Sequence, residues 1–290
     1  MVKEQGQLYL CATPIGNLGD ITYRAVGTLR TANLVAAEDT RHTRRLLAHY
    51  DIHTPMTSYH EHNKEEKGAE LIARMQAGET VVCVSDAGLP GIADPGGDLA
   101  RRAIAAGIPV IPLPGANAAL SALICAGLSL EGFAFVGFLP RREKKRRAVL
   151  ARLASYPETL IFYEAPHRLR ETLAALIAGL GAQRRACTAR ELTKKFEEFR
   201  RATLGELLTY YRENEPRGEF VLVVAGADGD AVSMGGGAAG QSLAERYEAH
   251  IAAGLDKKEA MRRIAQERGI SRRAVYQALI GASLRAQGRC

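Results

Sequence analysis

The chain has 290 residues, of which 47% are hydrophobic and 24% charged, a balance typical of globular proteins and unlike that of disordered or fibrous chains. No apolar run is long enough to span a membrane and no signal-peptide core stands near the first residue, so we expect a cytoplasmic protein without membrane contact. The formal net charge of +7 favours an acidic partner, and the five scattered cysteines, none in a C-x-x-C pair, favour reduced thiols over disulfides or metal ligands.

Short apolar runs alternate with amphipathic segments along the first part of the chain. The expected strands are residues 8–12, 33–37, 81–84 and 108–114. Helices are expected after each strand, one of them at residues 64–77 and one at 117–127. Asp20 is expected to cap the first helix, whose apolar stripe includes Ala25 and Leu29. This alternation predicts an α/β fold with a doubly wound parallel sheet.

Residues 81–97 are the centre of the predicted site, because a β-branched strand there runs into a loop of Gly, Pro and Asp. Ligands of open α/β sheets bind outside the carboxyl ends of strands, so we expect a small molecule at this loop. Its glycines let the main chain approach a ligand closely, and Asp86 is the first carboxylate available to an amine or hydroxyl group. A tight polar connection without a ligand is the structural alternative.

Other loops at strand ends are further candidates. Residues 13–20 form a glycine-containing turn without the G-x-G-x-x-G pattern, which argues against a nicotinamide or flavin enzyme. Residues 114–117 place a Pro-Gly turn at a helix start, where backbone N–H groups are open to a ligand. Residues 38–45 hold two carboxylates and three arginines, which suits either proton transfer or a capped helix with surface ion pairs.

His60, Glu61 and His62 have the H-x-H spacing of a chelating pair. No third ligand stands nearby, so we favour an imidazole and carboxylate cluster facing a substrate over a metal site. We therefore predict no metal ion in this protein.

A second α/β block follows. Its expected strands are residues 133–139, 159–164, 186–190 and 219–225. Residues 163–168 and 190–195 put Arg, Lys and Glu at strand ends, where either a cleft between the blocks or helix caps can use them. Residues 141–152 hold seven basic groups against one acidic group, which is typical either of a solvated helix face or of a surface for a polyanion such as RNA.

The expected domains are residues 1–118 and 119–228, both α/β, then a Gly-rich linker at 229–240 and a helical tail at 241–290. The tail has ten basic and five acidic groups. Asp256 is expected to cap the start of one helix, and Ser271, in the turn that contains Gly269, is expected to cap the start of the next. A helix-turn-helix that binds RNA and a simple three-helix appendage both agree with this pattern.

Seven stretches together resemble one family. They are residues 13–20, 38–41, 58–63, 85–96, 114–118, 135–140 and 163–168. The chain resembles the bacterial methyltransferases that modify a cytidine 2′-O in small-subunit rRNA, which belong to the tetrapyrrole methylase superfamily. The resemblance spans nearly the whole chain. One departure is Ala116-Asn117, where related sequences often have Pro-Ser or Ala-Ser, which puts a hydroxyl contact to the cofactor in doubt.

The resemblance implies two α/β domains of tetrapyrrole-methylase type with S-adenosylmethionine between them, a homodimer, and a cytidine ribose in the decoding region of 16S rRNA, free or in the 30S subunit, as acceptor. The residues it implies for the amino acid and ribose parts of the cofactor are Asp86, Ala87, Gly88, Leu89, Pro114, Gly115, Ala116 and Asn117. Tyr163, Glu164, Ala165 and Leu222 are implied to flank the adenine. Pro14 and Gly16 complete the expected cofactor site.

A ribose hydroxyl is a poor nucleophile, so a proton acceptor is expected to help. Our candidates are Glu61 and His60, with Arg168, Arg190 and Lys194 orienting phosphates, because all follow strands that face the expected cleft. Two other functions agree with parts of the sequence. One is methylation of a tetrapyrrole or a protein by the same superfamily, and the other is a DNA-binding regulator that senses a ligand. The basic clusters and the tail argue against a small porphyrinoid substrate.

Overall fold

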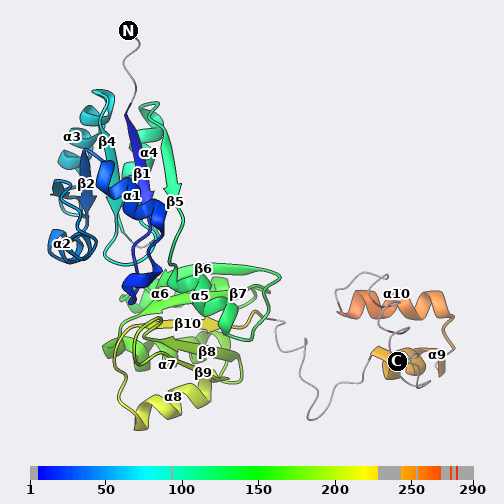
Figure 1. Ribbon diagram of the computed structural model, residues 1–290. Helices are drawn as coiled ribbons and strands as arrows, with labels where there is room; N and C mark the ends of the chain where they lie inside the picture. The colour runs from blue at the N-terminus through cyan, green and yellow to red at the C-terminus, as the bar shows by residue number, and fades with distance from the viewer. Residues whose placement is uncertain are drawn as a thin grey trace. The chain divides into compact units, whose positions relative to one another are not determined.

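The computed structural model describes residues 6–92, 94–227, 243–252, 254–268, 275 and 279. The chain separates into two compact units, Met1–Val232 and Ser233–Cys290. The first unit contains two five-stranded sheets (Figure 1). Within the described residues, no helix is both long enough and apolar enough to span a bilayer.

The first sheet is entirely parallel. Its strands are β1 (Gln7–Cys11), β2 (Leu34–Ala37), β3 (Met56–Ser58), β4 (Thr80–Val84) and β5 (Val110–Leu113), in the order β3-β2-β4-β1-β5. Helices α1 (Tyr23–Thr31) and α2 (Thr40–His49) pack on one face, and α3 (Lys64–Gln76) and α4 (Gly96–Ala105) on the other. This confirms the doubly wound parallel sheet.

Strand β4 explains why its sequence is apolar at successive positions. Val81 and Cys83 pack with α3 and α4, whereas Val82 and Val84 pack with α1 and α2. Both faces of a parallel sheet are covered by helices, so neither face of a central strand tolerates polar side chains. The strand ends at Val84, and the loop of the predicted site begins at the next residue, Ser85.

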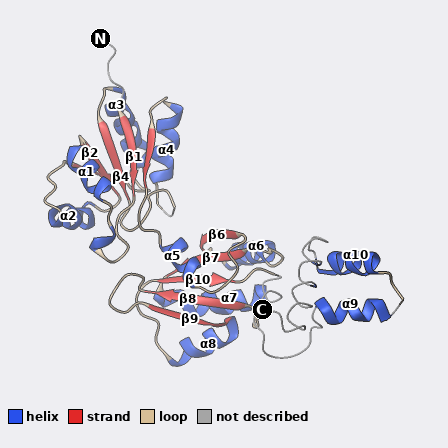
Figure 2. Cartoon of the chain, turned by 45° about the vertical axis from the view of Figure 1, so that its right-hand side comes forward, coloured by secondary structure: helices blue, strands red, loops and turns tan. Residues whose placement is uncertain are grey.

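The second sheet is mixed. Its strands are β6 (Phe133–Phe138), β7 (Thr159–Glu164), β8 (Arg185–Arg190), β9 (Glu198–Thr203) and β10 (Phe220–Val224), in the order β6-β7-β10-β8-β9. Only β6 and β7 are parallel, and each of the other pairs is antiparallel. Helices α6 (Glu143–Leu153), α7 (Leu169–Leu180) and α8 (Leu204–Glu213) pack on one face, and α5 (Ala118–Cys125) packs on the other (Figure 2).

Two expectations about local structure need correction. Asp20 ends a short 3₁₀ turn, η1 (Leu18–Asp20), and the cap of α1 is Thr22, whose Oγ1 accepts from the Ala25 N–H at 3.1 Å. Strands β3 and β9 were not expected, because both are edge strands with polar side chains and neither has a fully buried residue. The four described cysteines are free thiols, in agreement with the sequence, and Cys290 lies outside the described residues.

The second unit contains α9 (Leu243–Ala252) and α10 (Lys257–Arg268). Asp256 caps α10 as expected, since its Oδ1 accepts from the backbone N–H groups of Lys258 and Glu259, each at 2.8 Å. Ile264, Ala265 and Val275 form a small buried cluster. The expected linker and the Ser271 cap lie outside the described residues, so the choice between a helix-turn-helix and a simple appendage stays open.

Candidate active site

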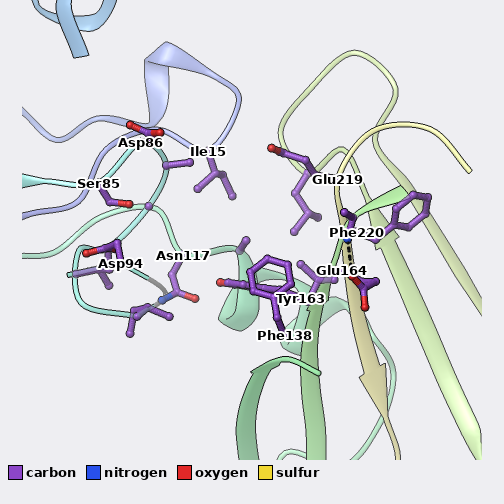
Figure 3. Close-up of a pocket in the computed structure, with 18 of the residues that line it drawn as sticks. Ile15, Ser85, Asp86, Asp94, Asn117, Phe138, Tyr163, Glu164, Glu219 and Phe220 are labelled. Carbon is purple, nitrogen blue, oxygen red and sulfur yellow. Dashed lines mark hydrogen bonds between the residues drawn. The ribbon is translucent and has the colours of Figure 1, made fainter. Parts of the chain in front are cut away.

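A cavity of about 540 Å³ lies where the strand ends of the two sheets meet. The first sheet contributes the segments that follow β1, β2, β4 and β5, and the second contributes the ends of β6, β7 and β8 with the start of β10. The lining residues are Ile15, Glu38, Ser85, Asp86, Ala87, Gly88, Leu89, Ile92, Asp94, Asn117, Ala118, Phe138, Tyr163, Glu164, Ala165, Pro166, Ala189, Leu192, Glu219, Phe220 and Val221 (Figure 3). The cavity therefore lies at the edge where ligands of open α/β sheets bind.

The loops after β1 and β4 are fixed to each other. The backbones of Thr13 and Gly88 exchange two hydrogen bonds of 3.0 Å, and Thr13 Oγ1 donates to the Ser85 carbonyl at 3.1 Å. Gly88 has a φ of +81°, and a Cβ there would lie 3.3 Å from Ile15 Cγ2. Glycine is the residue that adopts this backbone conformation without strain. Gly88 therefore allows the loop after β4 to hold a fixed position against the loop after β1.

Three carboxylates, those of Glu38, Asp86 and Asp94, line the first-sheet side. Asp86 Oδ1 accepts from the Asp39 N–H at 3.0 Å, and Asp94 Oδ1 accepts from the N–H groups of Gly91 and Gly96, each at 2.8 Å. Glu38 has a weaker contact, with Ser85 Oγ donating at 3.4 Å. Partial burial raises the pKa of Glu38, and the nearby charges of Asp86 and Asp94 raise it further.

The second-sheet side is mainly aromatic and aliphatic. The Tyr163 ring makes edge contacts with Phe135 and Phe138, at centroid distances of 5.0 and 5.8 Å, and burial raises the pKa of its hydroxyl. In Figure 3 the ring of Phe220 points away from the cavity, and it contacts Tyr211 at a centroid distance of 5.6 Å. Glu164 and Glu219 also line this side. Among the described lining residues none is basic and five are acidic, so the cavity suits a ligand that carries a positive charge and a flat apolar group.

Arg168 lies behind this side of the cavity. Its Nη1 is 3.5 Å from Oε1 of the fully buried Glu164, and its Nη2 donates to the Leu139 carbonyl at 3.1 Å. Glu164 also accepts from Thr172 Oγ1 and from the Ala165 N–H. The pair thus ties the end of β7 to the segment after β6, and Arg168 itself does not line the cavity.

The structure places eight of the expected cofactor residues on the cavity. These are Asp86, Ala87, Gly88, Leu89, Asn117, Tyr163, Glu164 and Ala165. Pro14, Gly16, Pro114, Gly115, Ala116 and Leu222 are not among the lining residues. Gly16 instead packs closely on the turn after β8, where a Cβ would lie 2.5 Å from Lys194 Cγ, and the Leu222 side chain faces the opposite side of its sheet.

The expected catalytic residues do not line the cavity. Glu61 is exposed and pairs with Lys64 at 2.6 Å, and His60 Nδ1 is buried without a hydrogen-bond partner in the described part of the chain. Lys194 lies closer, because its Nζ contacts the lining residue Glu219 at 2.8 Å. Arg190 donates to the Arg217 carbonyl at 2.7 Å. The roles expected for these side chains remain predictions.

Several lining residues were not among the site residues named from the sequence, including Glu38, Asp94, Phe138, Glu219 and Val221, although Glu38 and Asp94 stand in two stretches that the sequence analysis singled out, residues 38–45 and 81–97. A signal existed for the first two, since Glu38 directly follows a buried strand and Asp94 stands in the Gly-Pro-Asp loop. Phe138 and Val221 belong to strands, where the sequence does not say which face each side chain occupies.

Comparison with known proteins agrees with this geometry. Residues 7–208 match the family described as Tetrapyrrole (Corrin/Porphyrin) Methylases. Proteins named Ribosomal RNA small subunit methyltransferase I are 49% identical over 273 residues in Halalkalibacterium halodurans, covering 94% of both chains. The identity is 48% in Synechocystis sp., covering 94% of this chain and 96% of the relative, and 47% in Bacillus subtilis, covering 95% and 94%.

Solved structures share the fold at low sequence identity. Uroporphyrin III C-methyl transferase from Thermus thermophilus in its native form is 22% identical, with a TM-score of 0.55 and coverage of 76% of this chain and 97% of that chain. Diphthine synthase is 15% identical, with a TM-score of 0.55 and coverage of 76% and 90%. The chain belongs to the tetrapyrrole methylase family, within the group of the ribosomal RNA small subunit methyltransferase I proteins.

Proposed function

We propose that the protein transfers a methyl group from S-adenosylmethionine to RNA of the small ribosomal subunit. The names of relatives that match it over nearly their whole length support this proposal. The observation that carries it is the cavity at the strand ends, with five carboxylates and no basic group among its described lining residues, and with aromatic and aliphatic groups on the second-sheet side. The acceptor that the sequence resemblance implies is the 2′ hydroxyl of a cytidine in the decoding region. Because the proposed substrate is ribosomal RNA, we place the protein in the cytoplasm.

The residues of the cavity suit the two parts of S-adenosylmethionine. Asp86 and Asp94 supply negative charge for the ammonium and sulfonium groups, and Tyr163 and Val221 supply an apolar surface for the adenine. When bound, the cofactor supplies a methyl group that is activated by the positive sulfur. The volume of about 540 Å³ is within the usual range for sites that bind small molecules.

The main task of the chain is to hold the reacting groups in line. Good alignment of two reactants contributes roughly 7–11 kcal/mol toward lowering a barrier. The hydrogen bonds between Thr13 and Gly88, and those that Asp94 accepts from Gly91 and Gly96, keep the loops of the cavity fixed for this purpose. Loops held in this way need little further ordering when the substrates bind.

Glu38 is the lining carboxylate that we propose as acceptor of the hydroxyl proton. Asp86 and Asp94 already accept hydrogen bonds of 3.0 and 2.8 Å from backbone N–H groups, whereas the contact of Glu38 with Ser85 is 3.4 Å long. The raised pKa of Glu38 brings it toward the range in which a carboxylate is an effective base. Glu61 and His60 remain the alternatives predicted from the sequence.

The homodimer also remains part of the proposal. In the described part of the chain, α5 is the only helix that packs on one face of the second sheet, and exposed apolar side chains gather on α5, on β6 and on the segment between them. They are Leu120, Ile124, Leu130, Phe133 and Phe135. An apolar patch beside an unpaired edge strand is a suitable contact for a second copy of the chain. Sedimentation of an Ile124→Glu variant tests this, with a shift to monomer expected.

The decisive experiment offers methyl-labelled S-adenosylmethionine together with 30S subunits, free 16S rRNA, a porphyrinoid or duplex DNA. We expect label in the RNA of the first or second sample, at a ribose that resists alkaline cleavage. Label in the porphyrinoid would overturn the RNA substrate. Tight DNA binding without any transfer would favour the regulator instead.

A further inference from the structure

The end of β6 and the start of α6 form an exposed surface beside the cavity. We define this β6–α6 surface by one aromatic ring and four cations: Phe138, Arg141, Arg142, Lys144 and Lys145. Phe138 is 54% exposed although it lines the cavity, so its ring is open both to the cavity and to solvent. The surface is therefore continuous with the site at which we place methyl transfer.

A bulge in β6 directs Phe138 to this position. Phe135 lies opposite Ile161, but Gly137 lies opposite Phe162 and Phe138 opposite Tyr163, so one extra residue is inserted at Val136. In a regular strand Phe138 would share the face of Val136, which packs against the core under α6 and α7. The bulge, with Gly137 at a φ of +72°, instead places Phe138 beside Tyr163 on the cavity side.

The four cations are exposed, and within the described part of the chain they differ in their ion pairs from the two residues that follow them. The next two arginines on α6 have partners, since Arg146 pairs with Glu171 and Arg147 with Glu143. Among the described residues no carboxylate forms an ion pair with Arg141, Arg142, Lys144 or Lys145, so their charge is left uncompensated. Positive charge near a helix N-terminus opposes the helix dipole. Stabilisation of α6 therefore does not explain why four cations gather there.

We infer that the β6–α6 surface docks a single-stranded segment of the RNA substrate, with a base stacked on Phe138 and the flanking phosphates on the four cations. Bases stack on exposed aromatic rings, and unpaired Lys and Arg attract the phosphates beside them. A second copy of the chain suits this surface poorly, because a two-fold contact would bring the same cations of both copies together. The inference rests on the proposed function, since it assigns the RNA side of the same site.

The cations are tested by measuring how salt affects the affinity of the full-length protein for a labelled single-stranded RNA of mixed sequence. The variants are Arg141→Ala/Arg142→Ala and Lys144→Ala/Lys145→Ala, and the control is Arg24→Ala/Arg212→Ala, which removes two exposed positive charges on α1 and α8. We expect each test pair to reduce the slope of log affinity against log salt by up to about 1.4. If the control reduces the slope as much as the test pairs do, the β6–α6 surface is not a docking site, and RNA binding depends on the net charge alone.

Phe138 is tested with Phe138→Leu, which keeps an apolar side chain in the cavity wall, and Phe138→Tyr, which keeps the ring. We expect Phe138→Leu to weaken RNA binding about 5- to 100-fold and Phe138→Tyr to retain it. Equal RNA affinity of the two variants would overturn the stacking of a base on Phe138. A changed sedimentation coefficient with unchanged RNA affinity would instead assign the surface to a contact between two copies of the chain.

S-adenosylmethionine binding, measured by calorimetry on the same samples, separates this inference from the proposed function. If the wild type does not bind it, the proposed function fails, whereas loss of the RNA effect alone removes only this inference.

Discussion

The backbones of Thr13 and Gly88 exchange two hydrogen bonds, each 3.0 Å long, and so join the loop after β1 to the loop after β4. The pairing brings Gly88 against Ile15, another lining residue of the cavity. The shape of the cavity on the first-sheet side therefore depends on Gly88, because a side chain at this position would press on Ile15.

We expect Gly88→Ala to weaken S-adenosylmethionine binding. The new Cβ would lie 3.3 Å from Ile15 Cγ2 and 3.4 Å from the Ala116 carbonyl oxygen, at a φ of +81°. Gly107→Ala is the matched control, because its φ is +71° and no atom lies within 4 Å of the new Cβ. Both variants are expected to lose about 1–2 kcal/mol of unfolding free energy, since both force alanine into the left-handed region.

Calorimetric titration then separates strain from site damage. We expect affinity to fall about tenfold or more in Gly88→Ala and to stay at the wild-type value in Gly107→Ala. Equal affinities in the two variants would mean that the Gly88 loop does not hold the cofactor.

Glu38→Gln should lower activity while stabilising the protein at neutral pH. The folded-state pKa of Glu38 is raised by burial and by the charges of Asp86 and Asp94. The native state therefore binds this proton more tightly than the unfolded chain, so the stability it contributes is present at low pH and is lost as pH rises through the raised pKa. Glutamine cannot ionise, so the variant avoids that loss.

The kinetic part of this prediction is a changed pH profile. As proton acceptor, Glu38 must be ionised, so the rate should rise with pH through its raised pKa in the wild type and lose that rise in Glu38→Gln. Glu61→Gln and His60→Ala, measured alongside, test the two acceptors predicted from the sequence. A profile that changes in one of these variants and not in Glu38→Gln would return the role to that residue.

Deletion of residues 241–290 is expected to reduce RNA affinity and its salt dependence, and to leave S-adenosylmethionine binding unchanged. The segment holds ten basic and five acidic groups, a surplus of positive charge that attracts phosphates irrespective of sequence. The described residues that line the cavity all fall between Ile15 and Val221, outside the deleted segment, so we expect its ligand to bind as before. RNA affinity that survives the deletion at every salt concentration would exclude the tail from substrate binding.

Most of the fold could be predicted from hydrophobic patterning, because the central strands are buried on both faces and read as short apolar runs. The two missed strands, β3 and β9, are edge strands whose polar side chains remove that signal. The Asp256 cap in the tail could be predicted without such a pattern. It rests on the preference of an aspartate for accepting hydrogen bonds from the N–H groups of a helix start, which does not depend on packing.

The candidate site was predicted less completely, for two physical reasons. Strand β10 is apolar at all five positions, so the sequence does not say that Val221 faces the cavity and Leu222 the core behind it. Of the two adjacent acids after β2, Asp39 caps α2 by accepting from the Arg41 N–H at 2.8 Å, and Glu38 lines the cavity. Capping a helix and lining a site are both common roles of a carboxylate at a strand end, and only the structure shows which of the two acids has which role.

The buried pair of Arg168 and Glu164 provides a test of whether Arg168 contacts RNA or positions the strand ends. Its side chain is 13% exposed and that of Glu164 is fully buried. We expect Arg168→Met to lose about 3 kcal/mol of unfolding free energy, because removal of one partner leaves a buried charge with less compensation.

The double variant Glu164→Gln/Arg168→Met is expected to recover part of this loss, since it removes the uncompensated charge as well. Denaturant unfolding measures both, and RNA affinity measured below the unfolding transition gives the second readout. A positioning role predicts near wild-type RNA affinity in the double variant. If both variants lose RNA affinity equally while differing in stability, Arg168 contacts the phosphates directly, as its place at a strand end first suggested.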